Sequence, residues 1–523
     1  MLREYQLTNF KAFAGPETIP IRPITLIYGQ NSSGKSSLLQ SLLLLKQTLQ
    51  EAENPEALLL PKGNLVNLGG YREFIHRHDV SKPFSFKVLL DVDKQGIPEP
   101  LGKLLPHKLI DTPLLGLDVC FTYDEQTSNV VFSSVELFIG DDSSPVAIYK
   151  PQKRDILGFE GVESSSFPKT ILKLDRINYE HSLWQAWWET FGSQLPSYRT
   201  QQVMSSLQNS PHEYIKRKLK RGWNRNIAKA LQELQESINN RDKEKELYWR
   251  YYATKEVLQE IEALILLWQH FEKYSFNTAR EYFSNLNQGY SLDSRNFLPI
   301  KLANKFTTTS SDEPESLKIS QVYKQLWMPD IFNLTLEACS IFRHFLENVI
   351  YIGPLRDYPE RIYILSGNFS KEVGKSGKLL PDVLFKNREL LKQVNEQIER
   401  FRLGYELKVS SFTDETSGIS DLFALRLVDK DTGVNVSIQD VGFGISQVLP
   451  IIVQSMLSRN STLLIEQPEI HIHPRLQAEL GSLLAECIKH PFENQFIIET
   501  HSEHLMLRLQ KLIRKGELKP EDI

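Results

Sequence analysis

The stretch of sequence that decides the fold is Gly29-Gln30-Asn31-Ser32-Ser33-Gly34-Lys35-Ser36, a complete phosphate-binding loop. An apolar run over residues 23–28 precedes it and predicts a buried strand, and the Leu-rich segment 37–49 predicts a helix. In this context the glycines let backbone N–H groups close around phosphates, and the helix N-terminus adds the positive end of its dipole. The alternative is a turn whose glycines serve only helix entry, and the strand–loop–helix order favours nucleotide binding.

The loop residues predict a site for ATP and Mg²⁺. Lys35 is expected to reach the β- and γ-phosphates, and the Ser36 hydroxyl is expected to coordinate the metal ion. The residues expected to contact the nucleotide here are Gly29, Gln30, Asn31, Ser32, Ser33, Gly34, Lys35, Ser36 and Ser37.

Two more apolar strands, near the end of the chain, finish close to polar side chains. The first ends at Glu466, and a carboxylate at such a strand end can hold Mg²⁺ through water. The second is followed by His501, which could hydrogen-bond the γ-phosphate. The simpler interpretations are solvated loop acids at Glu466 and Glu469 and a helix-capping role for His501.

Two other segments carry weaker patterns. In segment 440–447, Gly444 and Ser446 precede a predicted helix and either contact a phosphate or form a tight turn with an N-capping serine. His471 and His473 face the same side of an extended segment, but no third ligand is placed, so a metal site is not expected there.

Composition limits the class of protein. The chain has 523 residues, 41% hydrophobic and 24% charged, which is typical of a soluble globular protein. The net charge of −4 excludes a chain-wide basic field for nucleic acid. Three distant cysteines exclude a disulfide framework, and no apolar run reaches the roughly 18–20 residues that span a bilayer. We therefore expect a cytoplasmic protein with no membrane partner.

The pattern predicts an α/β fold with a discontinuous head formed by residues 1–177 and 346–523. Short β-rich runs over 83–150 predict an antiparallel sheet, and the turn at 431–433 predicts a hairpin. Residues 178–345, which hold all seven tryptophans, predict a helical insertion domain.

One basic segment lies within the predicted insertion. Its charges surround Trp223 and could grip the backbone of DNA or RNA, although an exposed basic helix face is the favoured interpretation. The candidate residues are Lys216, Arg217, Lys218, Lys220, Arg221 and Arg225.

Taken together, several motifs give the chain a family likeness. It resembles the ABC-type ATPase heads of the SMC/RecF/OLD group, most of all bacterial OLD-related AAA-family ATPases of defence systems. This resemblance implies a mixed sheet flanked by helices, an antiparallel β lobe and a helical insertion. The motifs that carry it are segments 9–13, 29–36, 351–356, 440–447, 465–474 and 499–504.

The resemblance also implies roles for single residues. Glu466 would be the Mg²⁺-associated Walker B acid, and His501 the switch histidine. Ser446, with Gly444, would belong to the signature that contacts ATP bound by a second subunit, which implies a homodimer or higher oligomer. Gln467 stands where these families usually carry a catalytic Glu, and an amide cannot take a proton. We therefore expect slow hydrolysis, with Glu469 as a partial substitute.

The expected function is an ATPase that dimerises around ATP and controls a nuclease or toxin partner in antiphage defence. No acidic nuclease constellation is visible in the sequence, so cleavage is expected from a partner or from sequence absent in this chain. The alternatives are an SMC/RecF-like DNA-maintenance ATPase and a non-hydrolysing, ATP-dependent assembly scaffold.

Overall fold

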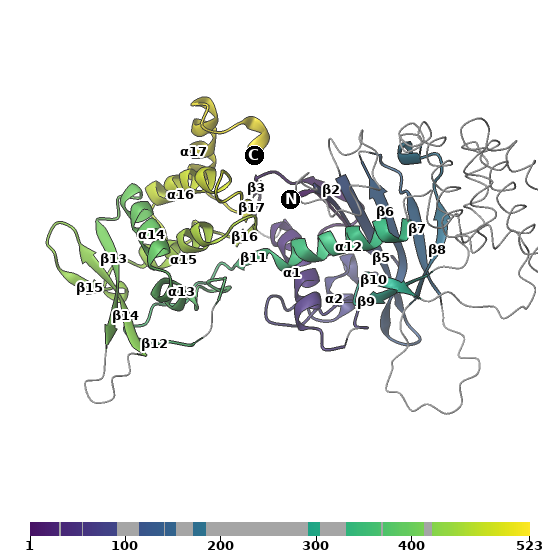
Figure 1. Ribbon diagram of the computed structural model, residues 1–523, viewed down its shortest axis with the longest axis horizontal. Helices are drawn as coiled ribbons and strands as arrows, with labels where there is room; N and C mark the ends of the chain where they lie inside the picture. Colours follow the sequence, from purple (N-terminus) through teal and green to yellow (C-terminus); the bar gives the residue numbers. More distant parts are fainter. Residues whose placement is uncertain are drawn as a thin grey trace, which may run out of the picture.

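A computed structural model of the protein describes residues 1–30, 33–54, 56–91, 114–140, 142–152, 171–184, 291–303, 331–367, 370–412 and 421–523. Within these residues the strands form three sheets. Helices cover the four-stranded sheet whose strands are parallel (Figure 1). The expected α/β class is confirmed. Parallel and antiparallel strands belong to separate sheets.

The parallel sheet joins the two ends of the chain. Its strand order is β11-β16-β17-β3, so the strand before the phosphate-binding loop lies beside a strand that begins some 470 residues later. The strands are β3 (Ile24–Ile27), β11 (Val349–Ile352), β16 (Thr462–Glu466) and β17 (Gln495–Glu499).

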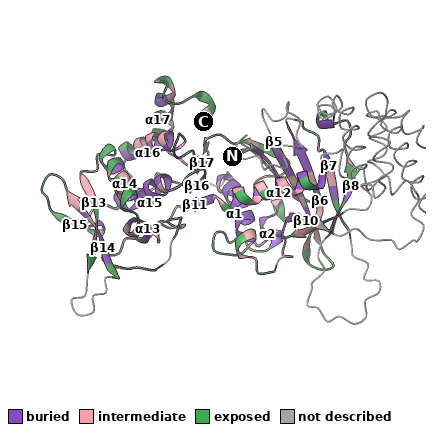
Figure 2. Cartoon of the chain, in the orientation of Figure 1, coloured by how far each residue is buried: buried purple, intermediate pink, exposed green. Residues whose placement is uncertain are grey.

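Both faces of this sheet are buried, which explains why its strands are continuous apolar runs. Leu464 and Ile497 point into one hydrophobic core, whereas Leu463 and Ile465 point into another. Figure 2 shows the buried segments on both sides of the sheet. The helices of the first core include α1 (Lys35–Glu51) and α12 (Ile331–Glu347). Those of the second include α15 (Phe443–Leu457), α16 (Pro474–Cys487) and α17 (Glu503–Arg514).

The nine-stranded sheet is antiparallel and includes the sheet expected over residues 83–150. Its order is β10-β9-β8-β7-β6-β5-β4-β1-β2, and α12 lies along its buried face (Figure 1). In β4 buried and half-buried residues alternate, as expected for a sheet with one face on the core. The strands are β1 (Leu2–Thr8), β2 (Glu17–Pro20), β4 (Phe84–Asp91), β5 (Leu114–Asp124), β6 (Asn129–Ile139), β7 (Ala147–Gln152), β8 (Ile171–Ile177), β9 (Ser291–Arg295) and β10 (Leu298–Ala303).

The third sheet contains the expected hairpin. β14 and β15 pair antiparallel across the turn at residues 431–433. The elements of this lobe are β12 (Tyr363–Ile364), β13 (Tyr405–Phe412), β14 (Leu422–Asp429), β15 (Asn435–Ser437), α13 (Leu380–Lys386) and α14 (Arg388–Arg400). One further short helix, α2 (Tyr71–Phe74), packs near the nine-stranded sheet.

The expectation of a helical segment over 178–345 is wrong for part of its range. Residues 291–303 form β9 and β10, because their backbone completes the nine-stranded sheet beside β8. α12 packs against that sheet and α1. Residues 185–290 and 304–330, which hold the other six tryptophans of the range, lie outside the described residues, and the domain boundaries stay a prediction.

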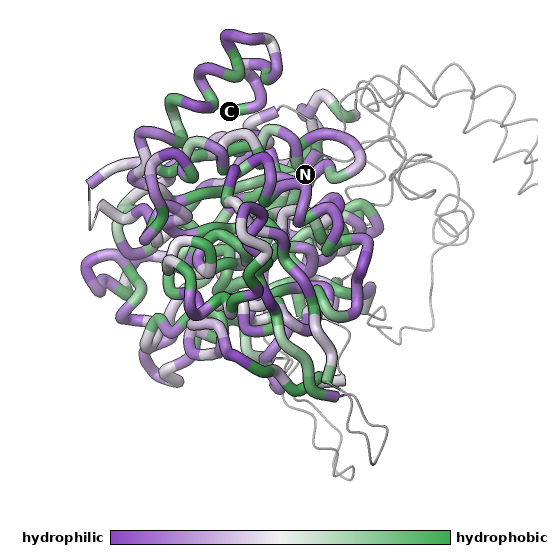
Figure 3. Tube along the Cα trace, turned by 90° about the vertical axis from the view of Figure 1, so that its left-hand side faces the viewer, coloured by the Kyte–Doolittle hydropathy of each residue, from purple (hydrophilic) through white to green (hydrophobic). Residues whose placement is uncertain are grey.

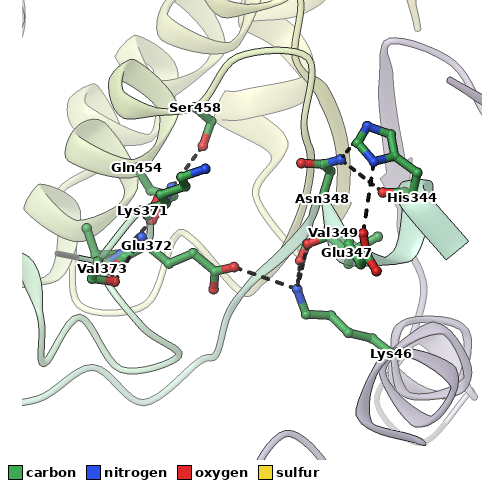
Figure 4. A network of polar contacts seen from close by, with 11 residues as sticks. Lys46, His344, Glu347, Asn348, Val349, Lys371, Glu372, Val373, Gln454 and Ser458 are labelled. Carbon is green, nitrogen blue, oxygen red and sulfur yellow. Dashed lines mark hydrogen bonds and ion pairs between the residues drawn. The ribbon is translucent and has the colours of Figure 1, made fainter. Parts of the chain in front are cut away.

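A buried lysine fastens α1 to the rest of the head (Figure 4). Lys46 Nζ donates to the backbone oxygens of Glu347 (3.3 Å) and Val349, and it lies 3.6 Å from a Glu372 carboxylate oxygen. Gln454 of α15 in turn accepts from Val373 N at 2.7 Å. This network ties α1, the start of β11 and α15 together across the parallel sheet.

The hydropathy of the chain agrees with the position of the buried cores. Hydrophobic stretches run through the middle of the molecule and hydrophilic ones along its outline (Figure 3). Of the helices that the structure describes, none has both the length and the hydropathy of a membrane-spanning segment.

Candidate nucleotide-binding site

The parallel sheet brings three predicted site segments to one edge. Glu466 at the end of β16 pairs in register with Glu499 at the end of β17, and Glu499 pairs with Ile27 at the end of β3. The loops that follow these strands therefore emerge together. In open α/β sheets, ligands bind at the carboxyl ends of the strands.

The loop after β3 turns sharply into α1. Gly34 has φ 93°, and a Cβ atom at this position would collide with the Cβ of Ala12, so only glycine fits. No side-chain hydrogen bond from the described residues caps α1, which leaves its first N–H groups available to an anion. The buried Lys35 ammonium donates to the backbone oxygens of Gly29 (2.9 Å) and Gln30 (2.7 Å).

A cavity of about 600 Å³ opens in front of this helix terminus. Its size is within the range of small-molecule pockets, and its walls carry two lysines and one carboxylate. The lining residues are Lys11, Ala12, Gly34, Lys35, Ser36, Ser37, Gln40, Gln467 and Glu499.

Glu466 is buried, so it is not a solvated loop acid. Its Oε1 accepts from Tyr351 Oη at 3.0 Å, and Arg356 Nη2 donates to its backbone oxygen at 3.1 Å. Burial raises the pKa of the Glu466 carboxyl; the Tyr351 hydrogen bond opposes the rise and the nearby Glu499 charge adds to it. Burial also lowers the pKa of Arg356 to about 10.

Gln467 and Glu469 have different positions. Gln467 lines the cavity with a left-handed backbone (φ 44°), and its N–H donates to Glu499 O at 2.7 Å. Both oxygens of Glu469 are engaged elsewhere: they accept from Thr500 Oγ1 (2.7 Å) and from His501 N (2.8 Å). Glu469 therefore holds the segment after β17 and is not among the residues that line the cavity.

His501 follows β17 and does not cap a helix. The N-cap of α17 is Ser502, whose Oγ accepts from Leu505 N at 3.0 Å. His501 Nε2 and Glu499 Oε2 are buried and have no hydrogen-bond partner among the described residues. Of these two residues only Glu499 lines the cavity in front of Lys35. Its unsatisfied oxygen suits a polar ligand there, because buried polar groups are normally hydrogen-bonded.

The residues at this edge fit Mg²⁺. The Ser36 hydroxyl and the Glu466 carboxylate are the hard oxygen donors that this ion prefers, and a bound Mg²⁺ would neutralise phosphate charge. Ser36 lines the cavity in front of α1, whereas Glu466 lines a neighbouring cavity of about 280 Å³ with Gln40 and Tyr351, so the two predicted metal residues do not line one cavity. At the other predicted pair, His473 Nδ1 caps α16 by accepting from Arg475 N at 3.2 Å. No cluster of three or more His, Cys, Asp or Glu side chains in the described part of the chain is placed to hold a metal.

The predicted signature residues lie at a different place. Gly444 and Ser446 are in the first turn of α15, and the Ser446 hydroxyl donates to Phe443 O at 2.7 Å. The N-cap is Gly442, so Ser446 is not the capping residue. Ser446 lines a separate cavity of about 370 Å³, so the structure does not place it in the cavity with Lys35.

Several pocket residues escaped the sequence-based prediction. Lys11 belongs to a quoted motif but had no role; its Nζ donates to Gln40 Oε1 at 2.6 Å inside the cavity. Glu499 ends the third apolar strand, a position that could have marked it as it marked Glu466. Asn31, Ser32 and the six basic residues Lys216, Arg217, Lys218, Lys220, Arg221 and Arg225 lie outside the described residues.

A comparison with protein families identifies the family of the chain. The sequence model of the AAA ATPase domain matches residues 1–506. The chain belongs to the AAA ATPase domain family. Membership agrees with an ATP-binding cavity in front of the phosphate-binding loop. No match to this AAA ATPase-domain protein was found among functionally curated proteins.

Solved structures similar to this AAA ATPase-domain protein include three SMC head domains. The first is the Pyrococcus furiosus Smc head with an extended coiled coil bound to the C-terminal domain of ScpA (11% identity, TM-score 0.33, covering 97% of this chain and 91% of that one). The second is the Pyrococcus yayanosii Smc head with a coiled coil and joint (11%, 0.34, 97% and 93%). The third is the Thermotoga maritima SMC head domain (9%, 0.33, 97% and 91%).

Proposed function

We propose that this protein hydrolyses ATP slowly with Mg²⁺, dimerises around the bound nucleotide and controls a nuclease or toxin partner. The observation that carries the proposal is the strand-end cavity, where Lys35, Ser36, Gln467 and Glu499 converge in front of the uncapped α1 terminus. Backbone N–H groups and a lysine suit a triphosphate, and phosphoryl transfer depends mainly on such positioning and charge stabilisation.

The position of the signature segment supports dimerisation. Ser446 lies outside the cavity that holds Lys35, so a second copy would have to present its α15 terminus to the nucleotide. Antiphage defence and the effector partner rest on the family resemblance of the motifs. The competing function is DNA maintenance of the SMC/RecF type, and an assembly scaffold without hydrolysis is the third possibility.

The test begins with ATP binding by calorimetry. Lys35→Ala should weaken ATP binding at least about 10-fold because it removes the phosphate-facing ammonium, whereas Lys392→Ala, an exposed site on α14, should not change it. Equal ATP binding by wild type and Lys35→Ala would contradict the site. Phosphate release is then measured with and without DNA. Release that DNA stimulates favours DNA maintenance, whereas release that DNA does not change favours the effector-controlling function. ATP-stable oligomers without phosphate release indicate the scaffold.

A further inference from the structure

Glu499 is a buried carboxylate in the nucleotide cavity, and none of the roles given above to Lys35, Ser36 and Gln467 involves its side chain. It is 5% exposed, lines the cavity in front of the phosphate-binding loop, and its Oε2 has no hydrogen-bond partner among the described residues. A buried polar atom without a partner costs about 1–3 kcal/mol, so its retention calls for a ligand that satisfies it.

The position of Glu499 is set by the strands on either side. β17 lies between β16 and β3, and Glu499 pairs with Glu466 on one side and with Ile27 on the other. Paired residues on neighbouring parallel strands point to the same face, and neighbouring strands lie about 4.8 Å apart. The Glu499 side chain therefore lies between the acid that ends β16 and the loop that holds Lys35.

Glu499 is also joined to the residue that departs from the expected pattern. Gln467 N donates to Glu499 O at 2.7 Å, and both side chains line the same cavity. The amide of Gln467 can orient a water molecule but cannot accept its proton, whereas the neighbouring carboxylate can do both. Glu469 is not placed for this role, because it does not line the cavity and its two oxygens accept from Thr500 and His501.

We propose that Glu499 is the catalytic carboxylate of the ATPase reaction, in place of the glutamate absent at position 467; this inference rests on the proposed function. Glu499 accepts a hydrogen bond from the attacking water and takes its proton. The water oxygen forms a bond to the γ-phosphorus, and the bond from that phosphorus to the β,γ-bridging oxygen breaks. The electron pair leaves on the β-phosphate of ADP, and Glu499 passes the proton to the released phosphate or to solvent.

The test compares Glu499→Gln with wild type in the full chain. The amide keeps the shape but not the basicity, so turnover should fall roughly 10²–10⁴-fold while ATP affinity stays within about threefold. The matched control is Glu503→Gln, an exposed acid in the first turn of α17, which should leave both values unchanged. Unchanged ATP affinity also shows that Glu499→Gln is folded.

A rescue variant tests the substitution of one carboxylate for the other. Adding Gln467→Glu to Glu499→Gln restores a carboxylate in the same cavity, and turnover should recover by at least about tenfold. A purely structural role for Glu499 predicts no recovery. Loss of Mg²⁺-dependent ATP binding in Glu499→Gln would make Glu499 a metal-site residue and would overturn the proposal.

The outcomes separate this inference from the proposed function. If wild type hydrolyses ATP and Glu499→Gln hydrolyses it at the same rate, only the role of Glu499 falls. If wild type binds ATP but shows neither hydrolysis nor retention of ADP with aluminium fluoride, the hydrolytic function and the role of Glu499 both fall. Retention of ADP–aluminium fluoride by wild type, lost in Glu499→Gln, supports the inference even where turnover is too slow to measure.

Discussion

At the scale of single residues, Gln467 combines an unusual backbone with a direct position in the cavity. Its φ of 44° lies in the left-handed region, and the hydrogen bond from its N–H to Glu499 O fixes it there. β17 therefore holds the backbone from which the Gln467 side chain enters the cavity. In the proposed reaction, the amide at this position orients water beside the Glu499 carboxylate.

Gln467→Glu should raise the rate of ATP hydrolysis by up to about tenfold, because it adds a second proton acceptor to a cavity that already contains Glu499. The measurement is phosphate release at saturating ATP and Mg²⁺. Gln126→Glu, which adds the same charge at the exposed β5–β6 turn, serves as the control and should not alter the rate. An unchanged or lower rate in Gln467→Glu would count against the assignment of position 467.

Sequence reasoning predicted residues that belong to local motifs and missed those defined by pairing between distant strands. The phosphate-binding loop is contiguous, so Lys35 and Ser36 could be predicted from their neighbours. Glu499 is part of the site only because β17 lies between β16 and β3 in a particular register. That register depends on two separate cores, and no local pattern contains it.

At the scale of elements, the strands and helices around the nucleotide site were predictable. β3, β16 and β17 are apolar runs, of which β16 and β17 end in a glutamate, and the turn of the β14–β15 hairpin is marked by Asp431-Thr432-Gly433. The prediction of helix was wrong at β9 and β10 for a physical reason. Two strands added at the edge of a sheet are stabilised by the neighbouring β8 more than by their own sequence.

The Lys46 network predicts a stability effect at this scale. Lys46→Met keeps the aliphatic stem but leaves the Glu347 and Val349 oxygens without their donor, so it should destabilise the head by about 1–3 kcal/mol. The denaturation midpoint, followed by circular dichroism, should fall accordingly. Lys515→Met, which removes an ion pair half-exposed on both sides, should leave the midpoint unchanged. A midpoint for Lys46→Met equal to that of wild type would mean that other donors, such as water, satisfy these oxygens.

At the scale of the whole molecule, the two ends of the chain meet in one parallel sheet, and a hydrophobic core packs on each of its faces. The helix α1, which follows the phosphate-binding loop, belongs to one core, whereas the start of α15 belongs to the other. The two halves of the proposed nucleotide sandwich are thus built on opposite sides of the sheet, which leaves the α15 terminus free to meet the site of another copy.

Phe443 offers a direct test of that sandwich, because it begins α15 and is 41% exposed. Its ring stacks on Tyr358 (centroids 6.0 Å apart) and meets His471 edge-on (5.2 Å). In the proposed dimer it would lie near the triphosphate held by the other copy. Phe443→Asp places a negative charge there, and like-charge juxtaposition across an interface costs several kcal/mol. An acid in the first helical turn is favourable for the helix itself, so α15 should remain folded.

Light scattering with a non-hydrolysable ATP analogue and Mg²⁺ should show the wild type doubling in mass, while Phe443→Asp should stay monomeric at concentrations up to about 100-fold higher. ATP affinity of the monomer should be unchanged, because Phe443 is not among the residues that line the cavity in front of Lys35. The matched control is Phe412→Asp on β13, which has the same 41% exposure and should dimerise like wild type. Dimerisation of Phe443→Asp at wild-type concentrations would place the contact between copies elsewhere and would leave the α15 terminus without a role in binding the nucleotide.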